Sequence, residues 1–387
     1  MTEKYPHLHL QDWPFQTVPD NRFWTFVADR KEVYSDILDI LAKLSRKTVS
    51  TIFLMEAYFG FGKTHMLRHI EFLCTTNHDR NLVPIYSEFP KNAKSFLDLY
   101  HCFIEKFDLE LIRSEYLEIC TDSNLKTQAN GLISQKSALM SKALPILCMG
   151  NKNQQEIVKN WLQGKTQNKQ VLQNLGILKN IDSPNEAADI IVSIVNLMGL
   201  RAPSKRIIWM IDDFHYINDR NENCRDEIYK YLTTVFNNCP HHFTILLCSS
   251  KKLLNFPKEF ADRIGFEKKI IIPPLNENDA KIFILDILTH FRTNEKIENL
   301  FFPFTAQAVD EVIKRLKENE GELKPRKLLQ IFNLILENLE IDLENKKIDE
   351  INTSIVLKIL CECFPDQKDK NSKEEKNDWI DSRTIRQ

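Results

Sequence analysis

Glycine is scarce in this sequence, and neither sign of charge dominates it. Only nine of the 387 residues are glycine, so Gly60 and Gly62, which are separated by a single residue, stand out. The 52 basic and 54 acidic residues give a formal net charge of −2. This balance gives no global sign of a nucleic-acid-binding protein, although it leaves room for a local basic patch.

Long apolar runs and paired cysteines are lacking as well. No run of about 18 apolar residues is present, so we expect no membrane span. The sequence begins without an apolar stretch of the signal-peptide type, and its nine cysteines have no disulfide or metal-site spacing. We therefore expect a cytoplasmic protein with reduced thiols, and we do not expect a nuclease, a protease or a metal enzyme.

Five short apolar runs alternate with helical patterns. They cover residues 50–55, 82–86, 206–211, 243–248 and 269–272. Strands separated by helices predict an α/β fold in which helices sandwich a parallel sheet. Pro84 indicates either that the second strand lies at an edge of this sheet or that it begins irregularly. The mostly helical residues 95–200 are too long for a simple crossover between two strands, so we expect a helical insertion there.

The patterns divide the chain into four parts. Residues 1–49 form an N-terminal segment with a first helix from residue 31, and residues 50–273 form the α/β core. Residues 274–364 are expected to form a helical domain, with helices near 276–291, 305–318, 325–339 and 349–364. Residues 365–387 are highly charged with few core side chains, and we expect a flexible tail.

The segment from Ala57 to Thr64 carries the clearest functional motif. It reads AYFGFGKT, which matches the phosphate-binding pattern G-x-x-x-x-G-K-[ST] except that Ala57 replaces the first glycine. An expected strand precedes the segment, and an expected helix over 63–73 follows it. Small residues let backbone N–H groups wrap phosphates, and the N-terminus of a helix adds the positive end of its dipole.

This motif predicts a P-loop that binds ATP with Mg²⁺. Lys63 is expected to reach the β- and γ-phosphates, and the Thr64 hydroxyl is expected to ligate the metal. The other loop residues expected to contact the nucleotide are Ala57, Gly60, Phe61, Gly62 and His65. The alternative is a strand-to-helix turn with an incidental Lys-Thr pair.

The strand expected at 206–211 ends in two carboxylates. Asp212 is placed to hold Mg²⁺, either directly or through water. Asp213 follows it, where an acid can orient or deprotonate the attacking water. The alternative is a strand that simply ends in a solvated Asp-Asp turn, and the presence of the P-loop favours the functional interpretation.

With these motifs the chain resembles the AAA+ and STAND ATPases, and best the AAA+ branch that includes origin-recognition initiators. These families usually have Asp-Glu where this chain has Asp212-Asp213. The shorter second carboxylate implies slow hydrolysis or a switch-like role as an alternative to rapid turnover. The resemblance further implies a P-loop NTPase core followed by a C-terminal helical lid domain.

Two more segments of the core fit this resemblance. Residues 26–30, FVADR, are similar to the segment F-V-G-R-x-x-E that lies beside the adenine in the family, which makes Arg30 a nucleotide-contacting candidate. Ser249, or else Ser250, stands where the family has a polar residue that touches the γ-phosphate or the attacking water. The alternatives are a helix start capped by Asp29 and an ordinary serine-rich strand end.

Two arginines correspond to further family positions. Arg263 matches the arginine finger that completes the ATP site of a neighbouring subunit, which implies self-assembly. Arg326, with Lys324 as the next candidate, matches the lid arginine of the motif G-x-P-R-x-L. The alternatives are a surface arginine paired with Asp262 or Glu259, and a proline-started helix with exposed basic residues.

The insertion contains short motifs similar to those of bacterial phage-defence ATPases of the BREX type. They lie at 161–164 (WLQG), 175–178 (LGIL) and 190–199. This similarity suggests a role in antiviral defence. The alternative is an amphipathic helical insertion of purely structural purpose.

We therefore predict an AAA+ ATPase that assembles with copies of itself to remodel or regulate DNA or a protein partner. The alternative is a slowly hydrolysing STAND-like nucleotide switch that recruits or activates a separate effector protein. Direct DNA contact is a third hypothesis, although charge runs are usually solvated faces. It depends on local basic residues at Lys47, Lys251, Lys252, Lys268, Lys269, Lys314, Lys317, Lys324, Arg326 and Lys327.

Overall fold

The computed structural model describes residues 4–16, 21–76, 81–250, 256–264, 268–293 and 298–363. They form two compact units. The larger unit contains the described residues between 21 and 273, except 28–30. The smaller unit contains residues 4–16, 28–30 and the described residues from 274 onward. The N-terminal segment is thus divided between the two units.

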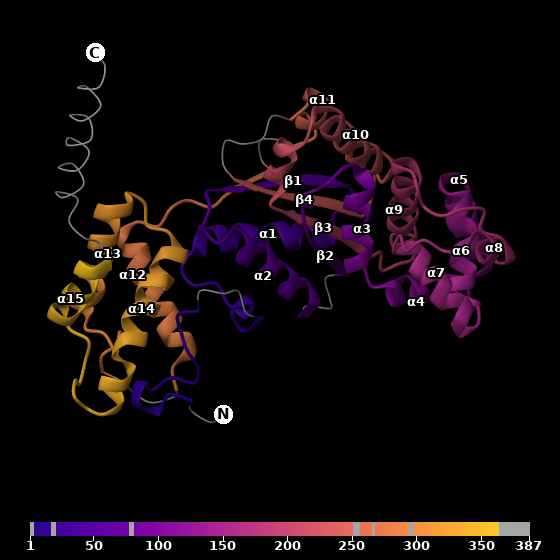
Figure 1. The fold of residues 1–387 in the computed structure, drawn as a ribbon. Helices are drawn as coiled ribbons and strands as arrows, with labels where there is room; N and C mark the ends of the chain where they lie inside the picture. The colour runs from indigo at the N-terminus through magenta and orange to yellow at the C-terminus, as the bar shows by residue number, and fades with distance from the viewer. Residues whose placement is uncertain are drawn as a thin grey trace, which may run out of the picture. The chain divides into compact units, whose positions relative to one another are not determined.

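A five-stranded parallel sheet forms the centre of the larger unit (Figure 1). Its strands are β1 (Thr51–Ala57), β2 (Leu82–Glu88), β3 (Arg206–Asp212), β4 (Phe243–Ser250) and β5 (Lys269–Ile271). Their order in the sheet is β2-β3-β4-β1-β5, and every pairing is parallel. The predicted parallel α/β sheet is confirmed. Pro84 lies in an edge strand as predicted, because β2 pairs on one side with β3 and ends the sheet.

Helices cover both faces of this sheet, because alternate strand residues belong to two different cores. Phe53 and Met210 belong to a core with α1 and α2, whereas Leu54 and Trp209 belong to a core with α3, α9 and α10. These helices are α1 (Lys31–Arg46), α2 (Lys63–Thr76), α3 (Phe96–Lys106), α9 (Pro184–Met198) and α10 (Glu222–Asn238). The continuous apolar runs that predicted the strands follow from this two-sided burial.

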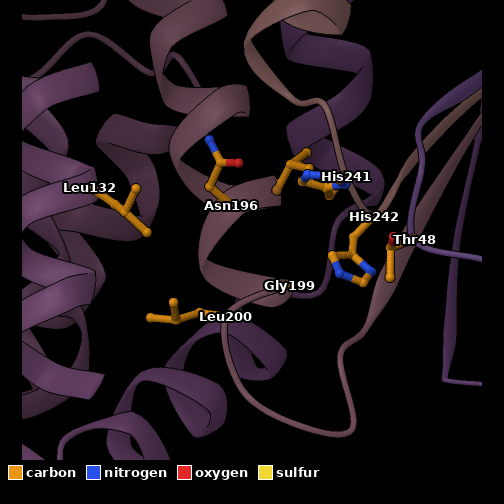
Figure 2. Close-up of a pocket in the computed structure, with 8 residues that line it drawn as sticks. Thr48, Leu132, Asn196, Gly199, Leu200, His241 and His242 are labelled. Atoms are coloured by element: carbon orange, nitrogen blue, oxygen red, sulfur yellow. The ribbon is translucent and has the colours of Figure 1, made fainter. Parts of the chain in front are cut away.

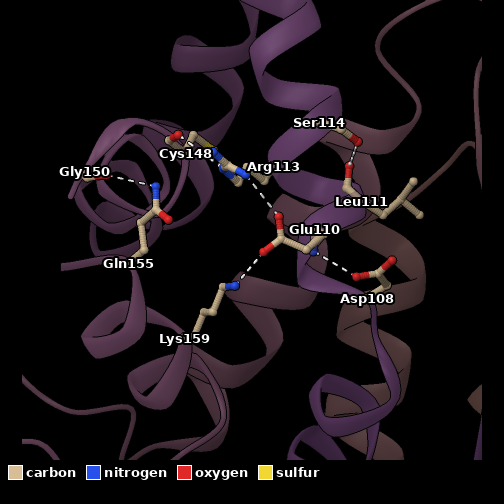
Figure 3. Close-up of polar contacts among 9 residues, drawn as sticks. All are labelled: Asp108, Glu110, Leu111, Arg113, Ser114, Cys148, Gly150, Gln155 and Lys159. Carbon is tan, nitrogen blue, oxygen red and sulfur yellow. Dashed lines mark hydrogen bonds and ion pairs between the residues drawn. The ribbon is translucent and has the colours of Figure 1, made fainter. Parts of the chain in front are cut away.

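The insertion between β2 and β3 is helical, as predicted. Between α3 and α9 it contains α4 (Leu109–Ile119), α5 (Ser123–Lys136), α6 (Ala138–Met149), α7 (Lys152–Leu162) and α8 (Lys169–Asn174). Serine, aspartate or asparagine side chains cap the N-termini of all seven helices by accepting backbone N–H groups. Figure 3 shows Glu110 on α4 bonded to both Arg113 and Lys159, which joins α4 to α7.

Four helices make up most of the smaller unit. They are α12 (Glu277–Phe291), α13 (Ala306–Glu320), α14 (Pro325–Glu344) and α15 (Thr353–Cys363). The short helix η1 (Pro6–Leu8) and its neighbours pack on them. Trp13 Nε1 donates to Asn333 Oδ1 at 2.6 Å, and the backbone N–H of Gln11 donates to the carbonyl of Phe291 at 2.7 Å. No helix in the described ranges is long and apolar enough to cross a lipid bilayer.

Candidate nucleotide site

The loop between β1 and α2 has the backbone that its two glycines permit. Gly60 and Gly62 have φ angles of 85° and 93°, a left-handed region where a side chain would be strained. Phe61 lies between them and is buried in the core beneath the loop. Ala57, in place of the first glycine of the motif, pairs with Ser250 as the last residue of β1. This extended position needs no glycine, so the departure from the motif is accommodated.

Lys63 is the first residue of α2 and is almost fully buried. Its Nζ donates to the carbonyls of Ala57 and Tyr58 at 3.1 and 3.2 Å. A lysine ammonium has three N–H donors. These two bonds hold the ammonium at the loop and leave one N–H donor for a ligand. The first N–H groups of α2 have no partner within the helix, which makes this end suitable for an anion.

Thr64 and Asp212 come from motifs 148 residues apart, and the structure brings them into contact. Thr64 Oγ1 donates to Asp212 Oδ2 at 2.7 Å. The Tyr86 hydroxyl donates to the same oxygen at 3.1 Å, and the backbone N–H of Asp213 donates to Asp212 Oδ1 at 2.8 Å. Hydroxyl and carboxylate oxygens are the ligands that Mg²⁺ prefers, so the two predicted metal ligands have suitable chemistry.

The carboxylate of Asp212 is only 1% exposed, and the donors around it, which include the buried Cys248 thiol, are all neutral. Within the described ranges, no lysine or arginine nitrogen lies within the 4.0 Å of an ion pair with it. Burying a carboxylate without a cation is costly. The Asp212 carboxylate is therefore suited to bind a cation from outside the chain.

Asp213 follows in a strained conformation. Its φ of 52° is left-handed, and it precedes the short helix η4 (Phe214–Asp219). Burial, and then the charge of Asp212, raises the pKa of Asp213. His215 Nδ1 lies 3.9 Å from Asp213 Oδ1. A carboxylate with a raised pKa beside a metal-binding candidate has the properties of a proton acceptor, which is the predicted role.

Two residues of β2 at this site were missed by sequence reasoning. The pairing of β2 with β3 places Glu88 opposite Asp212, and it brings the Tyr86 hydroxyl to the Asp212 carboxylate. A signal for Glu88 was available, because side chains that end neighbouring parallel strands meet at the same edge of the sheet. The register that aligns them was not available from the sequence.

The serines at the end of β4 lie beside the P-loop strand, because β4 is inserted between β1 and β3. Ser249 pairs with Glu56 and is fully buried, and its Oγ donates to the carbonyl of Ser250 at 3.2 Å. Ser250 is less buried and pairs with Ala57. The predicted role of either serine at the γ-phosphate stays a prediction.

Arg263 lies just after α11 (Lys258–Ala261), on the surface that α11 and α10 share. Its Nε donates to Asn237 Oδ1 at 3.1 Å, and its guanidinium also donates to the carbonyl of Glu259. The alternative of an ion pair with Asp262 or Glu259 is therefore not what holds this side chain. Its predicted action on a neighbouring subunit stays a prediction. Lys251 and Lys252 lie outside the described residues.

The segment expected beside the adenine is divided between the units. In the larger unit, His65 Nε2 lies 3.0 Å from the carbonyl of Phe26, and His69 Nδ1 lies 2.7 Å from the carbonyl of Trp24. These contacts hold residues 24–26 along α2, and burial lowers the pKa of His65, which keeps its ring neutral. His65 therefore contacts the expected adenine segment.

Arg30 and Arg326 belong to the smaller unit. Asp29 and Arg30 have left-handed φ angles of 42° and 89°. The backbone N–H of Asp29 donates to Asp286 Oδ2 at 2.9 Å, and burial lowers the pKa of Arg30. Arg326 is the second residue of α14, after Pro325. The predicted contacts of both arginines with a nucleotide stay predictions.

A cavity of about 350 Å³ lies near the amino ends of β1 and β4, at the opposite end of the strands from the P-loop (Figure 2). Thr48 precedes β1 and His242 precedes β4, whereas the P-loop follows β1. Gly199 lets the His242 ring approach the end of α9, because a Cβ there would lie 2.8 Å from His242 Cδ2. This cavity is separate from the candidate site.

The sequence matches no protein-family profile and no curated protein. The structure is similar to the Orc1 protein of Aeropyrum pernix solved in complex with DNA, with a TM-score of 0.51 and 10% identity over 90% of this chain and 69% of that chain. It is also similar to Cdc6p of Pyrobaculum aerophilum (TM-score 0.46, 11% identity, 86% of this chain and 68% of that chain).

A third similar structure is the RuvB Holliday junction branch migration motor of Thermotoga maritima, with a TM-score of 0.42 and 13% identity over 87% of this chain and 72% of that chain. At these identities the likeness concerns the fold alone. The likeness to Orc1, together with the strand order and the P-loop geometry, shows that the chain has the fold of the AAA+ P-loop ATPases.

Proposed function

We propose that this protein binds ATP with Mg²⁺ at the loop between β1 and α2 and hydrolyses it. The observation that carries the proposal is the buried Asp212 carboxylate, which contacts Thr64 of the P-loop and has only neutral donors within the described residues. A nucleotide-bound cation supplies the charge that this carboxylate lacks.

Each residue of the site has a defined part in this proposal. Lys63 and the first N–H groups of α2 hold the phosphates, and Thr64 and Asp212 hold the metal. When bound, Mg²⁺ supplies positive charge at the β- and γ-phosphate oxygens. Asp213 orients the attacking water and accepts its proton, and its raised pKa supports this role.

We further propose that the ATPase acts in an assembly of several copies that remodels or regulates DNA or a protein partner. The position of Arg263 on the surface of α10 and α11 supports a contact with a neighbouring subunit. The fold likeness to an Orc1 protein solved with DNA makes DNA the first partner to test. Antiviral defence remains a suggestion based on the motifs of the insertion.

A nucleotide-held switch is the second candidate function. Asp213 is shorter than the usual glutamate, and its left-handed backbone restricts its position. Both features favour slow hydrolysis. In this case ATP stays bound until a partner protein is recognised. Protein that is purified with stoichiometric nucleotide and turns over slowly supports the switch, and rapid steady-state hydrolysis argues against it.

The decisive experiment combines binding, turnover and subunit mixing. Wild-type protein is expected to bind and hydrolyse ATP, and Lys63→Ala is expected to lose affinity for it. Mixtures of wild-type and Arg263→Ala subunits are expected to show less activity than the sum of the separate proteins. Full nucleotide affinity in Lys63→Ala contradicts the site, whereas strictly additive activity in the mixtures contradicts only the assembly.

A further inference from the structure

Tyr86 reaches the oxygen of Asp212 that Thr64 also contacts. Its hydroxyl donates to Asp212 Oδ2 at 3.1 Å from the neighbouring strand, while Thr64 Oγ1 donates from α2 at 2.7 Å. The Tyr86 side chain is buried, at 3% exposure, in the core between the sheet and α2. One carboxylate oxygen is thus fixed by two hydroxyl groups that come from different elements.

The ring of Tyr86 is itself held from the other side. The guanidinium of Arg68 on α2 lies 3.4 Å from the centroid of this ring and 4.8 Å from the ring of Trp24. Arg68 also forms an ion pair with Glu71 at 2.9 Å. Trp24 is fixed in turn, because its carbonyl bonds to His69 of α2. A series of direct contacts therefore runs from residue 24 to Asp212.

The two hydroxyl groups on Asp212 Oδ2 have different tasks when a metal binds. The Thr64 hydroxyl has to turn a lone pair toward the cation while its proton is donated to Asp212 Oδ2. Tyr86 serves the carboxylate alone, and its place in a packed core keeps its hydroxyl where it is. Donors behind a ligating carboxylate set its orientation and the metal affinity.

We propose that Tyr86 is a positioning residue that holds the Asp212 carboxylate in place for the metal, and that Arg68, whose guanidinium lies over the rings of Tyr86 and Trp24, fixes Tyr86. This inference rests on the proposed function for the identity of the ligand. It adds to that function a link between the metal-binding carboxylate and residues 24–26, the segment expected beside the adenine.

Tyr86→Phe in the full chain tests the proposal, because phenylalanine fills the same core volume and removes only the hydroxyl. Mn²⁺ binding in the presence of a slowly hydrolysed ATP analogue is followed by electron paramagnetic resonance, and binding of the analogue in EDTA is measured separately. We expect about 10–100-fold weaker metal binding, which is the usual loss when a group behind a metal ligand is removed. Analogue binding in EDTA is expected to stay unchanged.

Tyr100→Phe is the matched control. Tyr100 is also fully buried and donates through its hydroxyl, but to the carbonyl of Leu162 in the insertion, at 2.7 Å. Both variants lose one buried hydrogen bond, worth about 1 kcal/mol. Only Tyr86→Phe is expected to change metal affinity. If Tyr86→Phe does not fold, Arg68→Lys is measured in its place, with a smaller loss of metal affinity expected in the same direction.

Three outcomes overturn the proposal. A positioning role is contradicted if Tyr86→Phe binds the metal as tightly as the wild type does. It is also contradicted if Tyr86→Phe and Tyr100→Phe lose the same amount of metal affinity. Where Arg68→Lys is measured instead, an unchanged metal affinity in that variant contradicts it. A wild-type protein that binds no metal–nucleotide complex contradicts the proposed function itself, so the two failures are distinguishable.

Discussion

Two carboxylates of the larger unit, Asp212 and Glu115, are each only 1% exposed, and their partners differ. Glu115 on α4 accepts from Arg201 Nε at 2.8 Å and also forms an ion pair with Lys205. Asp212 accepts from two hydroxyl groups and one backbone N–H and is in hydrogen-bond contact with the Cys248 thiol, and none of these four groups is charged. Cations of the chain therefore compensate the charge of Glu115. The neutral donors around Asp212 orient its carboxylate but do not compensate its charge.

This difference separates a structural charge from a functional one. Two cations next to Glu115 offset the cost of its burial and join α4 to the chain that leads into β3. Neutral donors around Asp212 fix its direction but leave its charge available to a ligand. The comparison predicts opposite responses to the same kind of substitution, with activity lost at one site and stability lost at the other.

Asp212→Asn gives the largest expected effect. The amide keeps the shape of the carboxylate but loses the charge that holds the metal, and metal charge contributes several kcal/mol to phosphoryl transfer. Turnover is expected to fall by about 1,000-fold, or about 4 kcal/mol. The melting temperature is expected to stay or to rise, because an uncompensated buried charge is removed. Steady-state hydrolysis measures the turnover, and a thermal melt measures the melting temperature. A lower melting temperature with normal turnover would contradict the functional role of the Asp212 charge.

Asp213→Asn is expected to lower turnover by about 100-fold, the lower range for loss of a general base. ATP affinity is expected to stay unchanged, because Asp213 is assigned no part in holding the nucleotide. Turnover and equilibrium binding are measured on the same preparation. If hydrolysis continues at the wild-type rate, Glu88 is the next acid to replace, since the register places it opposite Asp212.

Glu115→Gln is expected to lower the free energy of unfolding by about 2–3 kcal/mol. The value lies below the ~3–5 kcal/mol for a broken buried pair, because Arg201 and Lys205 are partly exposed and recover some hydration. Chemical denaturation measures the change. ATP turnover per folded molecule is expected to match wild type, and its loss would show that the two carboxylates are not independent.

Glu110→Gln is the matched exposed variant and the smallest expected effect. Glu110 lies on the same helix, α4, and also has two cationic partners, Lys159 and Arg113 (Figure 3). Solvent screening limits its loss to about 0.5 kcal/mol. Lys159, and then Arg113, lowers the pKa of Glu110, so its contribution is present above the pKa of the unfolded chain and is lost as the pH falls through the folded value. If Glu110→Gln lowers the free energy of unfolding as much as Glu115→Gln does, burial does not explain the difference between the two glutamates.

Much of the fold was predictable because it is encoded locally. The strands are continuous apolar runs, the insertion helices carry their own caps, and the P-loop requires glycine at positions of positive φ. The contact of Thr64 with Asp212 was predictable because β1 leads into the P-loop and β3 ends at Asp212, and parallel strands have their carboxyl ends on the same side of the sheet. The strand β1 continues through Ala57, beyond its predicted end, because it pairs with β4.

The missed features depend on long-range packing. Tyr86 and Asp212 are 126 residues apart, and Glu115 and Lys205 are 90 residues apart. Neither pair has a sequence pattern, since each depends on the register of strands or the packing of helices. The attachment of residues 4–16 to the smaller unit likewise depends on distant residues, since Trp13 and Asn333 are 320 residues apart.

Binding of a slowly hydrolysed ATP analogue, measured by calorimetry with and without Mg²⁺, tests the central claim most directly. Mg²⁺ is expected to tighten binding to the wild-type protein and to have little effect in Asp212→Asn, while both proteins bind the metal-free analogue equally. The same dependence on Mg²⁺ in both proteins would contradict the account, because the buried carboxylate would then not be a partner of the metal.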